Sequence, residues 1–566
     1  MLKFGHISQL DKHISLLTTM TDKQIFLVWG AVRDLLMGMH TNPIDIDATC
    51  AADPQDIFSS LQKHADSAVW LFRTEKFGTA TMLIKDADDI TYSYEITPFR
   101  EEGWYTDRRH PDEITRTSSL LSDAGRRDFT MNALYYTSVG VQQETWTPIW
   151  DALVIDSEQV IDQLTKQWWS YLYTPALCII QNNHIIQEIF PEGQFDAVAF
   201  NNFCILNKIP YDQSQWIRII LDPKEWLQDM LQGRLRAVWD PDRRFSEDAL
   251  RMLRALRFVN IWNQKWVACD FHKETRQSIK KHYHLIQYIA KERIHDELVK
   301  VFSANNPFGY VALLDEANML QYIFPALHRC KHNDQPIRYH PFDTYTHTLL
   351  TLWHVQQINT NYLVKLWMLY HDVGKPDQYY YYAQCKTKEE LEWVHASWAN
   401  HIVCWAEYAK RDFLALGFST KEADEIAWYV AMHMRPWQIL DARDDNQRKK
   451  VRVLFSEYWY DRLHSLFDIC RSDRLGQYNP IQSAEIGAVD ILYEHLNYLR
   501  DAEGQFTMQE MIVDGDDVMK EFGLPPSKEI GDLLKKAFQR VLHEKESRNT
   551  KHAILSYLRG IVTHGS

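Results

Sequence analysis

The hydrophobic pattern of the chain changes near residue 222, and this change constrains the fold more than any other feature. Before it, apolar and polar residues alternate over short segments, as in IDIDAT (44–49) and ITYSYEIT (90–97), which is typical of β-strands. After it, apolar residues recur at helical spacing almost throughout. We therefore expect an α+β fold, in which a head built on a mixed sheet precedes a mainly helical neck, body and tail.

Local patterns predict individual elements. In the head, residues 1–22, 31–38 and 126–136 have spacings that predict helices, and FLVWG (26–30) predicts a short strand that ends in glycine. Beyond the head, Ser246 precedes acidic residues and a helical pattern. We expect it to be the N-cap of a long helix.

The length of 566 residues suggests three or four domains. Between the head and the neck, strand-like pieces alternate with many Asn and Gln residues, which we interpret as an inserted subdomain of unknown role. The expected boundaries are 1–151 for the head, 152–221 for the insert, 222–330 for the neck, 331–490 for the body and 491–566 for the tail.

Charge, cysteine content and hydropathy exclude several classes of protein. With 62 basic and 76 acidic residues, the formal net charge is −14, which excludes a uniformly basic nucleic-acid-binding surface but allows local basic faces. The eight cysteines include no CxxC pair, as expected for reduced thiols in a cytoplasmic protein. No apolar run reaches the roughly 18 residues of a membrane span, and the first residues do not resemble a signal peptide.

An acidic pair, Asp45 and Asp47, lies on one of the expected strands. Because side chains alternate along a strand, both carboxylates point to one face, where they can hold two Mg²⁺ ions roughly 3.5–4 Å apart. Glu95, on a later strand, is a candidate third ligand. Upstream, Gly30 allows a phosphate to approach the backbone, and Arg33 follows in the first helical turn. Taken alone, such an acidic pair is more often a solvated strand face.

Five motifs nevertheless occur in a specific order. They are LVWGAVRDLLMG followed after six residues by DID, then KFGTATM, EITPFREEGWYTDRRHPDEI, RRDFTMNAL and RFSEDALRMLRALRF. Over residues 24–151 and 222–300 the chain thereby resembles class II CCA-adding enzymes (tRNA nucleotidyltransferases) and the related bacterial poly(A) polymerases. The resemblance implies a nucleotidyltransferase head that acts on tRNA with CTP and ATP and uses Mg²⁺.

The resemblance also implies roles for individual residues. Asp45 and Asp47 become the metal-binding catalytic pair. The implied nucleotide-binding residues are Gly30 and Arg33 at the phosphates, Arg127 and Asp128 at the ribose, and Asp248, Arg251, Arg254 and Arg257 as a protein template for the base and its phosphates. For the three arginines of that template, the alternative is a solvated basic stripe.

The proposed template has a chemical basis. Asp248 and Arg251 are three residues apart, which places them on one face of the expected helix. Cytosine and adenine each present a ring-nitrogen acceptor beside an amino donor, so Arg donates to one and Asp accepts from the other. Guanine and uracil have the opposite polarity, and each polar group left unpaired costs about 1–3 kcal/mol. We expect this pair to select C and A without a nucleic-acid template.

Trp29 departs from the family pattern, which usually has a second glycine at this position. We expect its ring either to crowd the triphosphate or to point into the core. The insert at 152–221 is the other departure, because it interrupts the usual short connection between head and neck.

Histidine and aspartate residues recur in order through the expected body. Such residues on neighbouring helices can converge on a divalent metal, and the ordered set resembles the HD-domain superfamily of metal-dependent phosphohydrolases. The implied transition-metal ligands are His347, His371, Asp372 and Asp473, with His395 and His433 completing a second-metal variant. The implied activity is that of a phosphatase or cyclic phosphodiesterase, and the alternative is an HD fold kept as an RNA-binding body without catalysis.

The sequence therefore predicts an enzyme that adds CCA to the 3′ end of tRNA from CTP and ATP, with the tail as a further tRNA contact and a secondary phosphohydrolase site in the body. The nearest alternatives are a poly(A) polymerase and a partial enzyme that adds only CC or only A. The alternative from another class is a catalytically weakened RNA-binding scaffold. We expect no membrane association and infer no protein partner.

Overall fold

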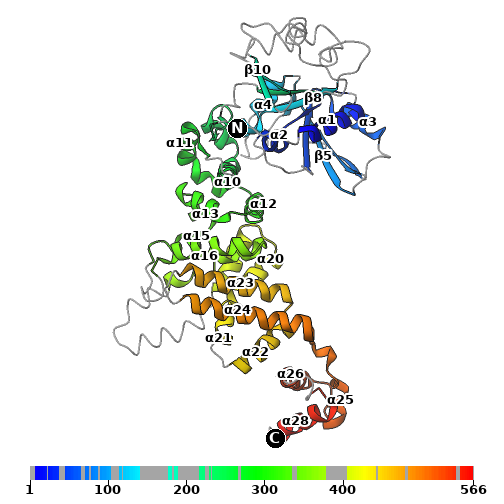
Figure 1. The fold of residues 1–566 in the computed structure, drawn as a ribbon, viewed down its shortest axis with the longest axis vertical. Helices are drawn as coiled ribbons and strands as arrows, with labels where there is room; N and C mark the ends of the chain where they lie inside the picture. The colour runs from blue at the N-terminus through cyan, green and yellow to red at the C-terminus, as the bar shows by residue number, and fades with distance from the viewer. Residues whose placement is uncertain are drawn as a thin grey trace. The chain divides into compact units, whose positions relative to one another are not determined.

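The structure of the protein is a computed structural model, in which the chain forms two compact units, 1–289 and 290–566 (Figure 1). The residues that it describes are 7–21, 23, 25–36, 45–64, 70–74, 78–86, 89–103, 114–117, 119–140, 176–181, 184–188, 216–222, 229–230, 232–264, 269–333, 341–377, 405–440, 444–477, 482–543 and 549–564.

A nine-stranded sheet forms the centre of the first unit, in the order β10-β9-β11-β8-β1-β2-β5-β4-β3. The pair β2 and β5 is parallel, and the other neighbours are antiparallel. The strands are β1 (Phe26–Leu27), β2 (Asp45–Cys50), β3 (Trp70–Thr74), β4 (Thr79–Lys85), β5 (Thr91–Pro98), β8 (Tyr135–Gly140), β9 (Ala176–Gln181), β10 (His184–Glu188) and β11 (Trp216–Asp222). This sheet is mixed, as predicted.

Alternation along β2 and β5 divides the sheet into a buried face and a polar face. Ile46, Tyr94 and Ile96 are buried on one face, which packs against α1 (Ile7–Thr21). Nδ1 of His13 on α1 lies 2.8 Å from the Tyr94 hydroxyl, so a polar contact anchors this packing. The opposite face carries the acidic residues of both strands, because side chains alternate along each strand.

Short helices and two-stranded pairs complete the first unit. The helices are α2 (Trp29–Leu36), α3 (Pro54–Gln62), α4 (Leu120–Gly125), the 3₁₀ turn η2 (Thr130–Asn132), α9 (Pro241–Glu247), α10 (Leu250–Gln264), α11 (Lys273–His282) and η3 (Tyr283–Tyr288). The additional strands are β6 (Arg100–Glu102), which pairs with β7 (Ile114–Arg116), and β12 (Arg234–Leu235), which pairs with β13 (Asp270–Phe271).

The helix predicted over 126–136 is wrong, because only the turn η2 forms there before β8 begins. The backbone of this segment pairs with a distant one instead of with itself. The N–H of Thr130 donates to the carbonyl of Arg236 (2.9 Å), and the N–H of Val238 donates to the carbonyl of Asp128 (3.1 Å). These long-range hydrogen bonds replace the local bonds that a helix would need.

The helix start predicted at Ser246 is also wrong, because this residue lies inside α9. Asp240 is the N-cap of α9, and its carboxylate accepts a backbone N–H two residues further on (3.0 Å). The chain then breaks at Asp248, whose extended backbone (φ −150°, ψ 103°) separates α9 from α10. Two helices therefore replace the single one expected here.

The described part of the predicted insert joins the head sheet. Within 152–221, the strands β9, β10 and β11 are described, and β11 pairs with β8 as well as with β9. The head sheet therefore continues into this region instead of ending at β8. The bounds of the five domains predicted from the sequence remain predictions.

The second unit is helical in its described part. Its helices are α12 (Lys291–Phe302), α13 (Pro307–Glu316), α14 (Leu320–Ile323), α15 (Pro325–His328), α16 (Thr344–Ile358), α17 (Tyr362–Met368), α20 (Thr420–Met432), α21 (Arg435–Leu440), α22 (Asp444–Glu457), α23 (Tyr460–Gly476), α24 (Gln482–Tyr498), α25 (Gly515–Phe522), α26 (Lys528–His543) and α28 (Lys551–His564). The predicted fold class, a mixed-sheet head followed by a mainly helical chain, is confirmed.

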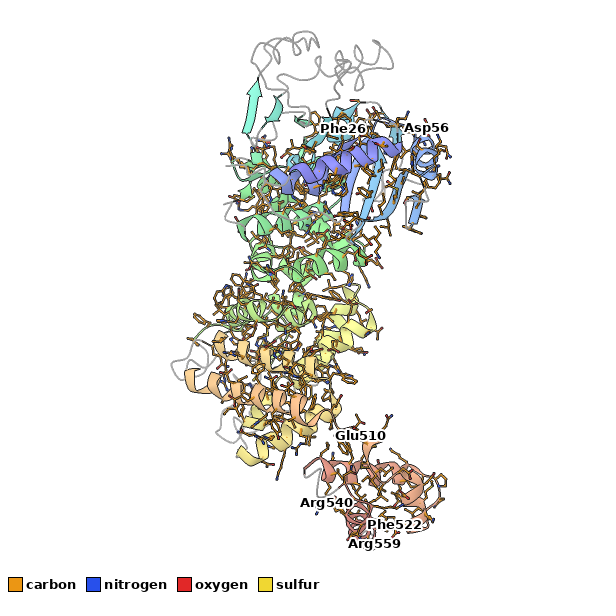
Figure 2. All side chains as sticks on the ribbon, turned by 45° about the vertical axis from the view of Figure 1, so that its right-hand side comes forward. Phe26, Asp56, Glu510, Phe522, Arg540 and Arg559 are labelled. Carbon is orange, nitrogen blue, oxygen red and sulfur yellow. The ribbon has the colours of Figure 1, made fainter. Side chains whose placement is uncertain are left out.

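Two helix groups shape the second unit. The long helices α16 and α23 pack against each other, and the C-terminal helices α25, α26 and α28 share an apolar core. Figure 2 shows Phe522, Arg540 and Arg559 on these C-terminal helices. None of the helices in the described ranges combines the length and the apolar character that crossing a membrane requires.

Candidate active site and candidate metal centre

Three carboxylates share the polar face of the head sheet. Asp45 and Asp47 are alternate residues of β2, and Asp47 lies directly opposite Glu95 on the parallel strand β5. Asp45 and Glu95 are exposed, whereas Asp47 is partly buried. Because paired residues on adjacent strands point to the same side, the register places all three side chains on one surface.

The charge environment of Asp47 suits a cation. Burial raises the pKa of Asp47, and Glu95 and Asp45 raise it further, so that it reaches about 6 despite the opposing charges of Arg127 and Arg254. A metal ion relieves such crowding because it stabilises the ionised carboxylates. Asp45, Asp47 and Glu95 therefore fit a divalent metal by their chemistry.

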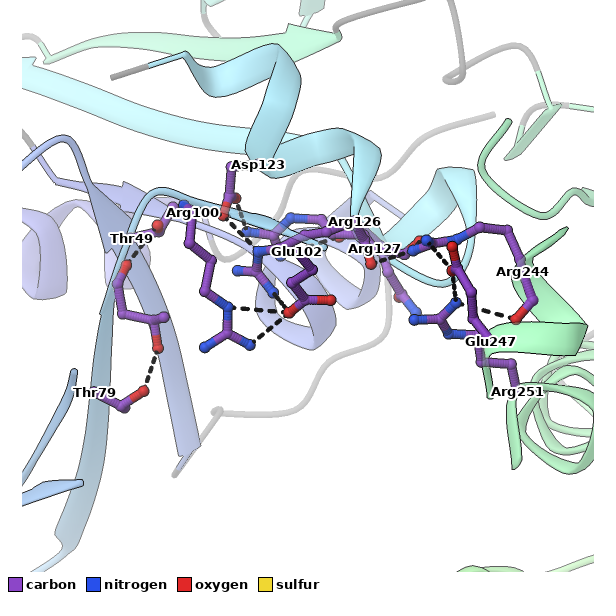
Figure 3. Close-up of polar contacts among 12 residues, drawn as sticks. Thr49, Thr79, Arg100, Glu102, Asp123, Arg126, Arg127, Arg244, Glu247 and Arg251 are labelled. Atoms are coloured by element: carbon purple, nitrogen blue, oxygen red, sulfur yellow. Dashed lines mark hydrogen bonds and ion pairs between the residues drawn. The ribbon is translucent and has the colours of Figure 1, made fainter. Parts of the chain in front are cut away.

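A pocket of about 230 Å³ borders Asp47 and Glu95. Its lining combines acidic residues, threonines and arginines, namely Val28, Trp29, Asp47, Ala48, Thr49, Thr79, Glu95, Thr97, Arg100, Arg126 and Arg127. Thr49 and Thr79 both bond to Thr97, at 2.6 Å and 3.0 Å, and lie on the sheet beside the arginines (Figure 3). Arginine guanidinium groups beside this acidic face suit a phosphorylated ligand.

Trp29 is the first residue of α2 and has a left-handed backbone, with φ 58°. This conformation costs a residue other than glycine about 1–2 kcal/mol, which gives a physical reason for a glycine here in the family pattern. Its ring centroid lies 5.3 Å from the guanidinium carbon of Arg127 and 5.9 Å from that of Arg254. Of the two expected positions for the ring, the structure thus favours the pocket.

A buried ion-pair network supports the pocket from behind (Figure 3). The Arg127 guanidinium is fully buried and donates to Asp123 (2.7 Å) and to the Tyr135 hydroxyl (3.1 Å), while Arg126 also donates to Asp123 (2.8 Å). Burial alone would raise the pKa of Asp123, but the two arginines lower it to about 2. Asp123 therefore fixes the position of Arg127, the residue expected at the ribose.

Asp123 was missed by the sequence reasoning. The signal for it was its position three and four residues before Arg126 and Arg127, a spacing at which an acid and a base meet on a helical turn.

Asp128 is the second residue expected at the ribose, and it pairs with Arg254 of α10 at 2.8 Å. Its carboxylate also accepts from the side-chain amide of Asn132 (3.0 Å) and from the backbone N–H of Phe129 (2.9 Å). Burial would raise the pKa of Asp128, but Arg254 and the hydrogen bond from Asn132 lower it to about 2. The carboxylate therefore joins the head to the predicted template helix.

Three of the predicted nucleotide-binding arginines gather around one ring. The guanidinium carbons of Arg33, Arg254 and Arg257 lie 5.1, 5.5 and 4.4 Å from the ring centroid of Phe258. These contacts bring α2 and α10 together. Gly30 also lies on α2, where an added Cβ would make only an ordinary contact, 3.6 Å from Arg33, so protein packing does not require a glycine there.

The predicted template pair, Asp248 and Arg251, is buried and bonded within the protein. Asp248 accepts from the backbone N–H of Leu250 (3.1 Å), and Arg251 donates to the carbonyl of Arg244 and to Glu247 (both 3.1 Å). Asp248 precedes α10, so the two residues share a turn and not a helix face, which corrects the prediction. In that turn, the N–H of Arg251 donates to the carbonyl of Asp248 (3.2 Å).

Arg244 is a second residue that sequence reasoning missed. Its guanidinium donates to the backbone carbonyl of Arg127 (2.7 Å) and to that of Arg126, and it pairs with Glu247 (2.6 Å) (Figure 3). The contacts with Arg126 and Arg127 span more than a hundred positions of sequence, so no local pattern could have indicated them.

The second unit brings together four predicted metal ligands, His347 on α16, His371 and Asp372 after α17, and Asp473 on α23. The Nε2 atoms of His347 and His371 are 3.2 Å apart, and Oδ1 of Asp473 lies 3.0 Å and 3.5 Å from them. Oδ2 of Asp372 lies 3.5 Å and 3.2 Å from the same two atoms. The expectation that His371 and Asp372 lie on a helix is wrong, because they occupy a turn.

This convergence is compact enough for a metal ion. The ligand atoms of His347, His371 and Asp473 all lie within 4.8 Å of one another. A hydrogen bond from Nδ1 of His371 to the carbonyl of Met368 (2.8 Å) directs Nε2 toward the cluster, as second partners of metal-binding histidines do.

The charges of the cluster shift the pKa values of its members. Burial lowers the pKa of His371, but Asp372 and Asp473 outweigh it and raise the pKa to about 10. Burial would raise the pKa of Asp372, but Lys375 and His371 hold it well below its usual range. Because metal binding displaces protons from its ligands, the donor set fits a divalent metal.

Of the two ligands predicted for a second metal, only His433 is described. The ring centroid of His433 lies 6.3 Å from that of His371, and its Nδ1 lies 2.7 Å from the carbonyl of Val430. His395 lies outside the described residues. Lys375 was missed as a neighbour of the site, and its Nζ lies 2.5 Å from Oδ2 of Asp372.

Comparison with known proteins identifies two domains in the chain. Residues 25–164 match the model of the poly A polymerase head domain, and residues 270–331 match that of a probable RNA and SrmB-binding site of polymerase A. The head match includes Asp45, Asp47 and Glu95, so it covers the polar face of the sheet.

Curated relatives carry the name CCA-adding enzyme. The protein of Lactobacillus helveticus is 28% identical over 292 residues, which cover 51% of this chain and 49% of the relative. The protein of Ligilactobacillus salivarius is 30% identical over 286 residues, which cover 50% of this chain and 46% of the relative. The chain thus spans about half the length of the curated relatives that it matches.

A solved structure shares the fold over nearly the whole chain. The CCA-adding enzyme of Bacillus stearothermophilus in complex with CTP superposes with a TM-score of 0.58 at 19% identity, covering 99% of this chain and 98% of that one. At this identity the likeness concerns the fold alone.

Proposed function

We propose that the chain adds CCA to the 3′ end of tRNA from CTP and ATP. The premise is that, through its head and its segment 270–331, it belongs to the family of class II CCA-adding enzymes and poly(A) polymerases. The observation that carries the proposal is the shared sheet face of Asp45, Asp47 and Glu95 beside an arginine-lined pocket. A cytoplasmic location is part of the proposal, since Cys50, Cys269, Cys330 and Cys470 are free thiols.

In this proposal Asp45, Asp47 and Glu95 hold Mg²⁺. The metal, when bound, lowers the pKa of the attacking hydroxyl and neutralises charge that develops at the triphosphate. The RNA 3′ hydroxyl attacks the α-phosphate in line, and pyrophosphate leaves. The strand register keeps the carboxylates on one surface, so the protein need not rearrange the sheet to bind the cation.

The arginines beside Phe258 would bind the nucleotide. Arg33, Arg254 and Arg257 present their guanidinium groups from two helices, and guanidinium groups pair with phosphate oxygens. Asp248 and Arg251 would read the base edge by exchanging their present internal partners for it. Because a nucleobase of the wrong polarity would leave those buried groups unpaired, at a cost of about 1–3 kcal/mol each, the exchange itself would select C and A.

An extension assay tests the proposal. The purified protein is incubated with tRNA that lacks its 3′ CCA, Mg²⁺, and CTP and ATP together or separately. We expect three nucleotides to be added, in the order C, C, A, and addition then to stop. A long adenosine tail would identify a poly(A) polymerase, products of CC or A alone would identify a partial enzyme, and no extension by the folded protein would identify an RNA-binding scaffold.

We also propose that the His347, His371, Asp372 and Asp473 cluster binds a transition metal and supports weak phosphohydrolase activity. The convergence of these four side chains within the second unit supports this second function. A bound metal would supply a hydroxide nucleophile at neutral pH, and Lys375 would offer a cation beside Asp372.

The test compares the wild type with a His371→Ala/Asp372→Ala double variant on 2′,3′-cyclic nucleotides and phosphomonoesters, with Mn²⁺, Ni²⁺ or Zn²⁺ added. We expect the variant to lose hydrolysis and keep CCA addition. Equal hydrolysis by both proteins would contradict the proposal and would favour a body without catalysis.

A further inference from the structure

An exposed aromatic pair lies on β3, the strand at one edge of the head sheet. Trp70 and Phe72 are alternate residues of β3, with exposed fractions of 50% and 48%. Their rings are stacked on each other, with centroids 5.5 Å apart and planes inclined by 5°. Large aromatic side chains that stay half exposed on one strand, already aligned in parallel, offer a flat surface to a planar ligand.

The strand register places this pair on the same face as the catalytic carboxylates. One row of directly paired residues joins Phe72 to Thr81, Glu95 and Asp47. A second row joins Trp70 to Leu83, Ser93 and Asp45. Since directly paired residues point to the same side of a sheet, the aromatic pair and the acidic pair form the two ends of one surface.

The two ends are separated by three strand spacings, or about 14 Å. At about 3.4 Å for each stacked nucleotide, this interval equals roughly four nucleotides. Thr81 and Glu95 lie between the ends in one row, and Leu83 and Ser93 in the other. Neither row contains Lys or Arg, so this surface is suited to contact bases rather than phosphates.

The nucleotide-binding side of the carboxylates lies in the opposite direction along the sheet. Trp29 follows β1, and Arg127 precedes β8, and both strands lie on the other side of β2 from β5, β4 and β3. The incoming nucleotide and the strand to be extended must approach the reacting centre from different directions. The side with β3 is therefore left for the RNA.

We propose that Trp70 and Phe72 form a stacking platform for the unpaired bases at the 3′ end of the RNA that is being extended. The inference rests on the proposed nucleotidyltransferase function of the head. Aromatic rings stack on single-stranded bases whatever their identity, which suits an end that becomes longer with each addition. The pair acts in positioning, because it holds the RNA and does not contact the reacting atoms.

Equilibrium binding of RNA tests this proposal without relying on catalysis. A tRNA without CCA, and one ending in CC, each carry 2-aminopurine at one of their last four positions and are titrated with the full chain. We expect the wild type to quench the fluorescence at one or two adjacent positions. A Trp70→Ala/Phe72→Ala variant is expected to lose this quenching and to bind the RNA at least about 5-fold more weakly, as base–aromatic stacking predicts.

Two further variants separate stacking from a general loss of surface. A Trp70→Phe/Phe72→Tyr variant keeps two rings and is expected to restore quenching and affinity. An Ile90→Ala variant removes another exposed apolar side chain of the same unit, at the turn between β4 and β5, and is expected to behave as the wild type. Thermal unfolding of each variant checks that the fold is retained.

The outcomes are distinct from those of the extension assay. If the double alanine variant binds and quenches as the wild type does, the platform does not exist. If that variant differs from the wild type only by a loss of self-association, the pair is a contact between protein molecules. If the wild type quenches 2-aminopurine but adds no nucleotide, the platform stands and the proposed function fails. Where extension occurs, the double variant is expected to raise KM for tRNA and leave KM for CTP unchanged.

Discussion

The two candidate metal sites of this chain are built in opposite ways. In the head, Asp45 and Glu95 are exposed side chains on a sheet surface, and the ligand set is entirely acidic. In the second unit, His347, His371 and Asp372 are buried and come from helices and a turn distant in the sequence. The carboxylates of the head face solvent, whereas the ligand atoms of the second unit already lie close together.

This difference indicates what each site is suited to do. An open carboxylate face binds hard cations that keep water ligands and arrive together with a triphosphate. A buried set that contains imidazole favours a transition metal and holds it longer. We therefore expect the head to exchange its metal with every turnover and the second unit to keep a resident one.

The largest expected effect distinguishes which site performs nucleotide addition. Asp47→Asn and Asp45→Asn remove a metal-binding charge with little change of shape, and we expect CCA addition to fall by at least about 10³-fold, since a metal supplies several kcal/mol of stabilisation. His371→Ala is the matched change in the second unit and should leave addition unchanged. Initial rates with tRNA lacking CCA measure both effects. If His371→Ala abolished addition and the Asp45 and Asp47 variants did not, the head would not be the site of nucleotide addition.

The next effect concerns metal retention. A transition metal at about one hundred times its Kd should raise the free energy of unfolding by about 2.7 kcal/mol. We expect this gain to disappear in His347→Ala and to persist in Asp45→Asn. Thermal unfolding, with elemental analysis after dialysis, measures it. A metal that remains bound to His347→Ala would refute the assignment of the cluster.

The pH dependence of metal binding sharpens the description of the head. Asp47 has a pKa of about 6, above its usual value, so below pH 6 a proton occupies the carboxylate that the metal needs. We expect the affinity of the head for Mn²⁺ to be constant above pH 6 and to fall about tenfold per pH unit below it. Titration in the His371→Ala background isolates this site, and an affinity independent of pH between 5 and 7 would contradict the prediction.

The smallest expected effect concerns Trp29. Trp29→Gly and Trp29→Ala lose the same ring contacts with Arg127 and Arg254, but only glycine is relaxed at a φ of 58°. We expect the alanine variant to be less stable than the glycine variant by about 1 kcal/mol. Denaturant unfolding measures the difference. Equal stabilities would mean that the backbone rearranges, and a large gain in rate for Trp29→Gly would mean that the indole obstructs the pocket.

Short-range patterns predicted the polar face of the head well. Alternation along β2 was sufficient to orient Asp45 and Asp47, and the strand character of ITYSYEIT placed Glu95 within reach. The same reasoning failed at 126–136, where the helical pattern was real but hydrogen bonds to Arg236 and Val238 prevailed. Hydrophobic periodicity reports the local conformational preference of a segment. It contains no information on hydrogen bonds to backbone groups that are distant in the sequence.

The contacts that join distant segments were accessible only through resemblance, or not at all. His347 and Asp473 lie 126 positions apart and meet at 3.0 Å, and only the order of the motifs suggested their convergence. Arg244 had no such signal, because its partners are backbone carbonyls of the head. A carbonyl carries no side-chain identity, so a sequence cannot indicate which one a guanidinium will bind.

The contacts of Arg244 join two segments of the first unit. One guanidinium holds two successive carbonyls and the carboxylate of Glu247, which in turn holds Arg251. A rotation of the turn before α10 would therefore displace the segment Arg126–Arg127, which lines the pocket. The linkage therefore couples the turn that carries Asp248 and Arg251 to the segment that carries Arg126 and Arg127, so that a shift of one strains the contacts of the other.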